Sequence, residues 1–269
     1  MNCFTFKPNE ESDAFVRAFL HTPLTEMKKY RTKRPSVIVC PGGGYRYLSE
    51  REAEPVASKY YADGYNVFIL YYSLNENAKN LAPLKELSLT IMKIRDNQDE
   101  WGCEPEKIAS CGFSAGGHLV ACISTMWDDS ELLKSIDTQN GKNKPNAIIA
   151  CYAAFSDKNF DKNSSIMNID GMSKQEAMKF YSAYEKVSKN TCPTFIFHCM
   201  NDPVAKVENA ILHAQKLDEF DIYSEIHFFP TGAHGGSIYK NETNSKNTSS
   251  EQWYELSLKF LNKLFEYEY

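Results

Sequence analysis

The run Gly112-Phe113-Ser114-Ala115-Gly116 carries the strongest chemical signal in the chain. A G-x-S-x-G pattern is typical of a sharp turn between a buried strand and a helix, with the serine hydroxyl exposed at the tip. Glycine is expected at both flanks, because a Cβ there would collide with the neighbouring strand or helix. Such a serine is a candidate nucleophile, and it then requires a base, an orienting acid and hydrogen-bond donors for an oxyanion.

Asp202 and His234 could supply the acid and the base. Asp202 follows the apolar run 194–198, and His234 lies in a glycine-rich loop after the predicted strand 222–229. The order serine, aspartate, histidine is the one expected for a nucleophile at a strand-to-helix turn. Asp157, which also follows a predicted strand, is the alternative acid.

A glycine triplet could supply the oxyanion donors. The apolar run 37–40 leads into Pro41-Gly42-Gly43-Gly44-Tyr45, where the lack of side chains lets backbone N–H groups approach a substrate oxygen. We expect an N–H group of Gly43 or Gly44 to act together with that of Ala115.

Other residues near the predicted strand ends have a weaker case. His118, His198 and His213 lie on predicted helices or at a strand end, and we expect them to be structural. Several aromatic residues are candidates for the wall of a substrate pocket, with core packing as the alternative for each. They are Tyr45, Tyr47, Tyr72 and Phe155.

Short apolar runs alternate with longer amphipathic segments along the chain, which is typical of a mainly parallel sheet covered by helices. The stretch 4–20 predicts one or two further strands, antiparallel at the sheet edge. The sequence thus predicts an α/β fold, with a twisted, mainly parallel sheet of about eight strands and helices on both faces. The apolar runs are 37–40, 67–71, 108–111, 147–151 and 194–198.

We expect residues 1–269 to form a single domain, since this length is ordinary for one α/β domain. Two polar segments, 127–146 and 156–192, interrupt the alternation. One follows the helix after Ser114 and the other follows a strand end, where ligands bind in such sheets. We expect both to be loop insertions that flank or roof the site.

Composition argues against several classes of partner. The net charge is -5 and no run of Lys and Arg occurs, so nucleic acid is not expected to bind. No apolar run approaches the roughly 20 residues that span a bilayer. The eight cysteines show no spacing typical of zinc, so no metal is expected, and several lie in apolar segments, which suits reduced thiols. The first residues lack the pattern of a signal peptide, and we expect a cytoplasmic location.

Taken together, four motifs resemble those of α/β-hydrolase esterases of the acetyl-esterase and xylan-esterase type, relatives of the hormone-sensitive-lipase group. This resemblance implies an α/β-hydrolase fold, no cofactor, and hydrolysis of small acyl esters, often acetyl groups on sugars. It implies a triad of Ser114, Asp202 and His234. One departure is Cys199 after His198, where relatives usually carry glycine. The motifs are Pro41-Gly42-Gly43-Gly44-Tyr45, Gly112-Phe113-Ser114-Ala115-Gly116-Gly117-His118, Asp202-Pro203-Val204 and Gly232-Ala233-His234-Gly235.

Two alternatives stay open on the residues alone. A peptidase-like serine hydrolase that binds a free amine would need an acidic anchor, for which Glu50, Glu52 and Glu54 are candidates. A hydrolase fold can also persist as a binding protein without catalysis, since a fold does not fix a function. The expected partner is a small-molecule ester, and neither the alcohol nor the oligomeric state follows from the sequence.

Overall fold

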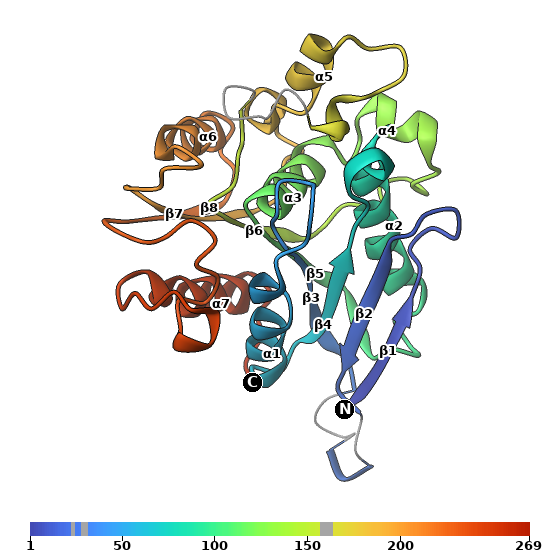
Figure 1. Ribbon diagram of the computed structural model, residues 1–269. Helices are drawn as coiled ribbons and strands as arrows, with labels where there is room; N and C mark the ends of the chain where they lie inside the picture. The colour runs from blue at the N-terminus through green and yellow to red at the C-terminus, as the bar shows by residue number, and fades with distance from the viewer. Residues whose placement is uncertain (23–24, 28–31, 157–163) are drawn as a thin grey trace.

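Eight strands form one sheet within the residues that the computed structural model describes, namely 1–22, 25–27, 32–156 and 164–269 (Figure 1). Their spatial order is β1-β2-β4-β3-β5-β6-β7-β8. β2 pairs antiparallel with both β1 and β4, and all other neighbours are parallel, which confirms the predicted sheet and its antiparallel edge. The strands are β1 Asn2–Phe6, β2 Phe15–Leu20, β3 Arg34–Cys40, β4 Asn66–Tyr71, β5 Cys103–Phe113, β6 Ala147–Cys151, β7 Thr194–Cys199 and β8 Ser224–Phe229.

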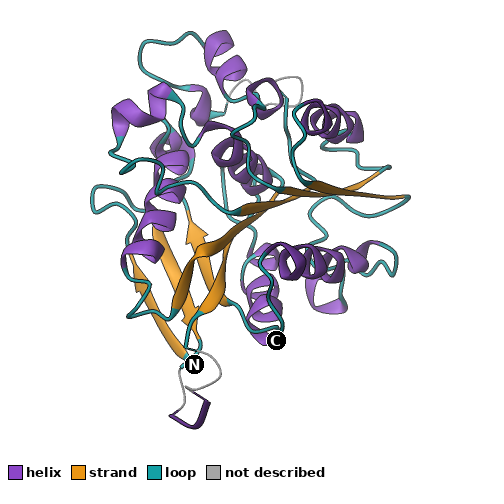
Figure 2. Ribbon diagram, turned by 180° about the vertical axis from the view of Figure 1, so that it is seen from behind, coloured by secondary structure: helices purple, strands orange, loops and turns teal. Residues whose placement is uncertain are grey.

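Helices cover both faces of this sheet, as the two opposite views show (Figures 1 and 2). α1 and α7 pack on one face, and α2, α3 and α6 pack on the other. Within the described ranges, none of the helices has the length and apolar character needed to cross a membrane. The helices are α1 Glu54–Ala62, α2 Ala82–Asp96, α3 Ala115–Met126, α4 Ser130–Ser135, α5 Lys174–Phe180, α6 Val207–Glu219 and α7 Trp253–Leu264, and short 3₁₀ turns include η2 Glu50–Glu52, η3 Asn75–Ala78 and η5 Ser165–Met167.

The central strands are apolar on both sides because each side faces a different helix layer. Along β3, Val37 and Val39 pack with α1 and α7, whereas Ile38 and Cys40 pack with α2 and α3. Successive side chains of a strand point to opposite faces, so a strand between two layers reads as a continuous apolar run. This is the reason why these strands could be located in the sequence.

The chain reverses its direction of winding between β3 and β5. From β3 it crosses to β4 on one side, and it then returns to β5 on the other side of β3. Cys40 lies opposite Gly112 in the β3–β5 register. The loops after β3 and β5 therefore diverge from neighbouring strand ends, and such a switch point leaves a crevice for ligands.

Residues 127–146 lie at the other end of the sheet, so the expectation that they flank the site is wrong. A helix that connects parallel strands runs back along the sheet, and α3 therefore delivers the chain to the edge where the strands begin. There the side chain of Asn146 accepts a hydrogen bond from the Ile108 N–H group at 3.1 Å, near the start of the β5–β6 pairing. The Arg95 guanidinium donates to the carbonyl oxygen of Lys144 at 2.8 Å.

The described part of 156–192 does reach the carboxyl end of the sheet. Its turn η5 packs against η3, and the Asn80 N–H group donates to the carbonyl oxygen of Asn168 at 2.9 Å. Ser164, Ile166 and Met167 line a cavity that also contains Ser114. This segment therefore contributes to the surroundings of the candidate nucleophile.

Candidate active site

Ser114 forms a strained turn between β5 and α3. Its backbone has φ +51° and ψ -112°, a conformation that residues with a Cβ rarely adopt. The turn is closely packed: a Cβ on Gly112 would overlap the carbonyl oxygen of Gly116, and a Cβ on Gly116 would overlap that of Cys40. Both flanking glycines are thus needed for close packing, the first against α3 and the second against the end of β3.

Ser114, His234 and Asp202 form one hydrogen-bonded chain. The distance from Ser114 Oγ to His234 Nε2 is 2.8 Å, and that from His234 Nδ1 to Asp202 Oδ2 is 2.7 Å. The ionised carboxylate accepts from Nδ1–H, which leaves Nε2 free to accept from the serine hydroxyl. A serine, base and acid in this order can move a proton off the serine oxygen as it attacks.

The Asp202 carboxylate is buried and held from several sides. Its Oδ1 accepts hydrogen bonds from the N–H groups of Val204, at 2.8 Å, and Ala205, at 3.0 Å. Burial by itself would raise the pKa of Asp202, but His234 and these two N–H groups outweigh it and lower the pKa below its ordinary value. The carboxyl group therefore stays ionised at neutral pH and can orient the imidazole of His234.

His198 packs against this carboxylate as a neutral ring. Its Nε2 lies 2.7 Å from the carbonyl oxygen of Ala205 and 3.6 Å from Asp202 Oδ2. Burial lowers the pKa of His198, so the ring is uncharged at neutral pH. It supports the Asp202 loop, in line with the structural role expected for it. The alternative acid, Asp157, lies outside the described residues.

The glycine triplet lies beside Ser114. Gly43 and Gly44 have φ of +131° and +63°, and Gly44 lines a cavity together with Ser114 and Ala115. Across the described residues, the N–H groups of Gly43, Gly44 and Ala115 donate no hydrogen bond to another protein atom. Free N–H groups next to a nucleophile are suited to bind developing negative charge on a substrate oxygen.

Of the four aromatic residues considered for the pocket wall, Tyr45 lines the cavity that contains Ser114 and Ala115, and Tyr47 lines a second cavity at Ser114. The prediction is wrong for Tyr72, which is buried beneath the glycine loop, where its hydroxyl donates to the carbonyl oxygen of Pro41 at 2.6 Å. It is also wrong for Phe155, whose ring stacks on His213 of α6 with centroids 4.3 Å apart. Both side chains turn into the core because partners from distant parts of the chain cover them there.

Two cavities open at Ser114 and His234. The first, called the apolar cavity below, has a volume of about 200 Å³, and the second, called the arginine cavity, about 340 Å³. Arg51 and the exposed ring of Tyr47 line the arginine cavity, and Arg46 lines both cavities. The apolar cavity is lined mainly by Tyr45, Ala115, His118, Ala154, Ile166, Met167, Val204 and Ala205.

Sequence patterns offer only a weak signal for some of these residues. Ile166 and Met167 are an apolar pair within the polar segment 156–192, which could have marked them as contacts. Val204 and Ala205 follow Asp202 after a single proline, and their position after the acid was the available signal.

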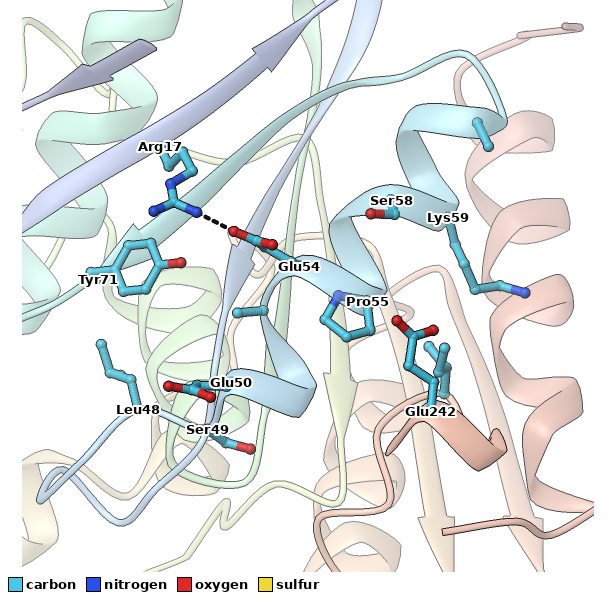
Figure 3. A pocket seen from close by; sticks show the side chains of 13 residues that line it. Arg17, Leu48, Ser49, Glu50, Glu54, Pro55, Ser58, Lys59, Tyr71 and Glu242 are labelled. Atoms are coloured by element: carbon cyan, nitrogen blue, oxygen red, sulfur yellow. Dashed lines mark hydrogen bonds and ion pairs between the residues drawn. The ribbon is translucent and has the colours of Figure 1, made fainter. Parts of the chain in front are cut away.

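A further cavity, of about 680 Å³, lies elsewhere (Figure 3). It contains none of Ser114, Asp202 and His234. Glu50 and Glu54 face this cavity, and the Glu54 carboxylate forms an ion pair with Arg17 (Figure 3). The turn η2 thus faces two cavities: Glu50 lines this one, whereas Arg51 and Glu52 line the arginine cavity.

No group of three or more His, Cys, Asp or Glu side chains in the described part of the chain could hold a metal ion. All eight cysteines are free thiols, and seven of them are buried.

Comparisons with known proteins identify relatives of this chain. The family model BD-FAE matches residues 24–217. The chain is 28% identical over 214 residues to endo-1,4-beta-xylanase B of Butyrivibrio fibrisolvens, covering 78% of this chain and 34% of that protein. It is 26% identical over 207 residues to the acetylxylan esterase of Xylanibacter ruminicola, covering 74% of this chain and 40% of that protein. The chain thus spans well under half the length of these two curated relatives.

Solved structures resemble the chain over nearly its whole length. The α/β hydrolase MGS-M1 from a deep-sea metagenome is 29% identical with a TM-score of 0.81, and the match covers 99% of each chain. The acetyl ester-xyloside bifunctional hydrolase of Caldicellulosiruptor lactoaceticus is 26% identical with a TM-score of 0.78, covering 97% of this chain and 91% of that one. The carboxylesterase Cest-2923 of Lactobacillus plantarum, 22% identical with a TM-score of 0.86 and full coverage of both chains, supports the fold alone.

Proposed function

The chain belongs to the BD-FAE family of α/β hydrolases, and from this premise we propose that it is a serine esterase that hydrolyses short acyl esters. The observation that supports the proposal most directly is the hydrogen-bonded chain from Ser114 through His234 to Asp202, with contacts of 2.8 Å and 2.7 Å. The N–H groups of Gly43, Gly44 and Ala115, which have no acceptor within the described residues, lie beside the same serine. Nucleophile, base, orienting acid and oxyanion donors are the parts that acyl transfer requires.

In the first half of the proposed reaction, Ser114 Oγ attacks the ester carbonyl carbon. His234 Nε2 takes the hydroxyl proton as the carbon–oxygen bond forms, and Asp202 stabilises the resulting imidazolium. The carbonyl oxygen becomes an oxyanion and accepts hydrogen bonds from the N–H groups of Ala115 and of Gly43 or Gly44. His234 then gives the proton to the departing alcohol, which leaves an acyl group on Ser114.

In the second half, water replaces the alcohol. His234 removes a proton from the water as its oxygen attacks the acyl carbon, and the same donors stabilise the second oxyanion. The proton then returns to Ser114 Oγ as the carboxylic acid leaves. The cycle restores the enzyme, and no step requires a cofactor.

The size of the apolar cavity supports a short acyl group. Its volume of about 200 Å³ is small, and buried Ile166 and Met167 limit it on one side. We propose that the acyl group binds there, and that the alcohol binds in the arginine cavity, where Tyr47 and Arg51 offer a ring face and polar donors. A sugar carrying an O-acetyl group suits this arrangement, with its acetyl group in the apolar cavity and its ring in the arginine cavity. The names of two relatives, an acetylxylan esterase and an acetyl ester-xyloside hydrolase, agree with this substrate class.

The peptidase alternative lacks an available acidic anchor among the three candidates. Glu50 and Glu54 face the cavity of Figure 3 rather than Ser114. Both oxygens of Glu52 already accept hydrogen bonds within the protein. We therefore expect turnover of an ester and little turnover of the matching anilide, and equal turnover of both would favour a peptidase.

The proposal is tested by Ser114→Ala with p-nitrophenyl acetate as substrate. We expect the variant to lose hydrolysis by a factor of at least about 10³ while its melting temperature stays close to that of the wild type. A fluorophosphonate should label the wild type and not the variant, as detected by intact mass. Wild-type protein that neither hydrolyses the ester nor reacts with the fluorophosphonate would instead indicate a binding protein without catalysis.

We also propose a cytoplasmic location and a single domain for the chain. Free thiols at all eight cysteines support a reducing compartment. One sheet built from strands at both ends of the chain supports a single domain.

A further inference from the structure

The buried carboxylate of Glu52 contacts both the glycine loop and the end of β6. Its Oε2 accepts a hydrogen bond from the Gly42 N–H group at 2.8 Å, and its Oε1 accepts one from the Tyr152 hydroxyl at 2.6 Å. Only 2% of Glu52 is exposed. Gly42 directly precedes Gly43 and Gly44, so this contact fixes the position from which the candidate oxyanion donors extend.

Tyr152 extends the connection to the loop that carries His234. The Tyr152 hydroxyl accepts a hydrogen bond from the Ser237 N–H group at 3.0 Å, and its ring centroid lies 5.0 Å from that of His234. The Ser237 hydroxyl in turn donates to the carbonyl oxygen of Arg51, the neighbour of Glu52. One network therefore joins the glycine loop to the histidine loop.

The hydrogen bonds favour the ionised form of Glu52. The Tyr152 hydroxyl has a single proton, and because its oxygen accepts from Ser237, that proton points to Glu52. The Gly42 N–H group occupies the other carboxylate oxygen, so both oxygens act as acceptors. Burial raises the pKa of Glu52 above its ordinary value, and the hydrogen bonds from Tyr152 and Gly42 offset part of this rise. A buried charge is costly unless it is paired in this way.

We propose that Glu52 is a positioning residue for the esterase reaction, holding the Gly43 and Gly44 N–H groups in register with His234. The inference rests on the proposed function, because it concerns the same site. Reacting groups displaced by about 1 Å can lose on the order of 10²-fold in rate. A carboxylate that fixes two loops at once therefore acts on catalysis without touching the substrate.

The same turn offers a matched control. Glu50 begins η2 and Glu52 ends it, but Glu50 is exposed and faces the separate cavity of Figure 3. Glu50→Gln changes the same charge on the same turn without touching Gly42 or Tyr152. Any effect that Glu52→Gln shares with Glu50→Gln is then an effect of net charge alone.

The experiment compares Glu52→Gln, Tyr152→Phe, their double variant and Glu50→Gln. We expect Glu52→Gln to lower kcat for p-nitrophenyl acetate by about 10- to 100-fold, with KM changed by less than about threefold. The affinity for a trifluoromethyl ketone, which forms an oxyanion on Ser114, should fall by the same factor as kcat/KM. Because both residues act through one network, the double variant should be no slower than the slower single variant.

Three outcomes decide the proposal. If Glu52→Gln keeps kcat and ketone affinity within about twofold of Glu50→Gln, the positioning role is wrong. If Glu52→Gln is inactive because it unfolds, as its melting curve reports, Tyr152→Phe decides: an unchanged kcat and an unchanged rate of fluorophosphonate labelling would reject the role. If the wild type itself neither hydrolyses esters nor reacts with the fluorophosphonate, the proposed function has failed, and this inference fails with it.

Discussion

The Tyr45 hydroxyl lies 2.8 Å from Nδ1 of His118, at the wall of the apolar cavity. The other ring nitrogen, Nε2, lies 3.0 Å from the carbonyl oxygen of Tyr181, to which it donates. Nδ1 is therefore the acceptor, and the tyrosine hydroxyl donates to it. Burial lowers the pKa of His118 to about 4, so the ring is neutral at pH 7. A neutral imidazole on α3 thus connects the glycine loop to the segment that follows α5.

Replacing Tyr45 by Phe is expected to destabilise the protein. The variant keeps the ring that lines the cavity but removes the hydroxyl that donates to buried His118. Loss of such a buried hydrogen bond costs about 1–2 kcal/mol in the free energy of unfolding. Urea denaturation at pH 7 measures this loss in the free energy of unfolding. A variant as stable as the wild type would show that this hydrogen bond contributes nothing net.

Replacing His213 by Leu is expected to stabilise the protein. Both ring nitrogens of His213 are buried without a hydrogen-bond partner among the described residues, and its ring stacks on Phe155. Leucine removes two unpaired polar atoms, so we expect a gain of about 1 kcal/mol or more in the free energy of unfolding at pH 7. Thermal and urea denaturation test this, and a loss of stability would contradict it.

The same variant should change how stability depends on pH. Burial lowers the pKa of His213 from 6.5 to about 3. Below pH 6.5 the unfolded chain takes up a proton that the folded chain does not, so stability falls as the pH drops towards 3. One such histidine contributes a slope of about 1.4 kcal/mol per pH unit. His213→Leu should reduce the wild-type slope between pH 6 and pH 4 by about that amount.

His118→Leu is the matched control for this measurement. It also removes a buried histidine with a lowered pKa, and it should reduce the slope in the same way. At pH 7, however, it should destabilise the protein, because the Tyr45 hydroxyl and the Tyr181 carbonyl lose their partner. Opposite effects at pH 7 with similar effects on the slope are the expected result.

Gly44→Ala is expected to lower activity more than stability. A Cβ on Gly44 would meet no atom within 4 Å, but the φ of +63° is unfavourable for alanine by about 1 kcal/mol. A shift in this loop would misplace an oxyanion donor, and loss of one such donor costs about 10²–10³ in kcat. Steady-state kinetics and a melting curve separate the two effects.

Gly171 provides the comparison for Gly44. It also has a positive φ, of +83°, and open space around its Cβ position, but it lines neither cavity at Ser114. Gly171→Ala should cost a similar free energy of unfolding and leave kcat unchanged. Equal kinetics for the two variants would show that Gly44 has no special place in catalysis.

The sequence was sufficient to locate the strand ends because of how the sheet is buried. β3, β5 and β7 lie between two helix layers, so each reads as an apolar run followed by turn residues. Side chains after parallel strands gather at one edge, which is why Ser114 and Asp202, far apart in sequence, could be assigned to one site. Their catalytic roles stay predictions until the variants are measured.

Side-chain direction beyond a strand end could not be predicted in the same way. Tyr72 and Phe155 both follow a buried strand, but what they contact lies far away in sequence: Pro41 for the first and His213 for the second. Periodicity reports burial along an element and says nothing about a partner from another one. The misplacement of 127–146 has a similar cause, because the course of α3 decides at which end of the sheet that segment emerges.

Met167→Ala should shift the preference of the proposed esterase towards longer acyl groups. Met167 is 1% exposed and lines the apolar cavity, so removing its side chain lengthens the space available to an acyl chain. A methylene bound in an apolar pocket is worth about 1–3 kcal/mol, so the ratio of kcat/KM for butyrate over acetate esters should rise about tenfold or more. Met178→Ala is the control, because Met178 packs against the same core without lining the cavity. If both variants leave the ratio unchanged, the acyl group does not bind beside Met167, and the assignment of the two cavities is wrong.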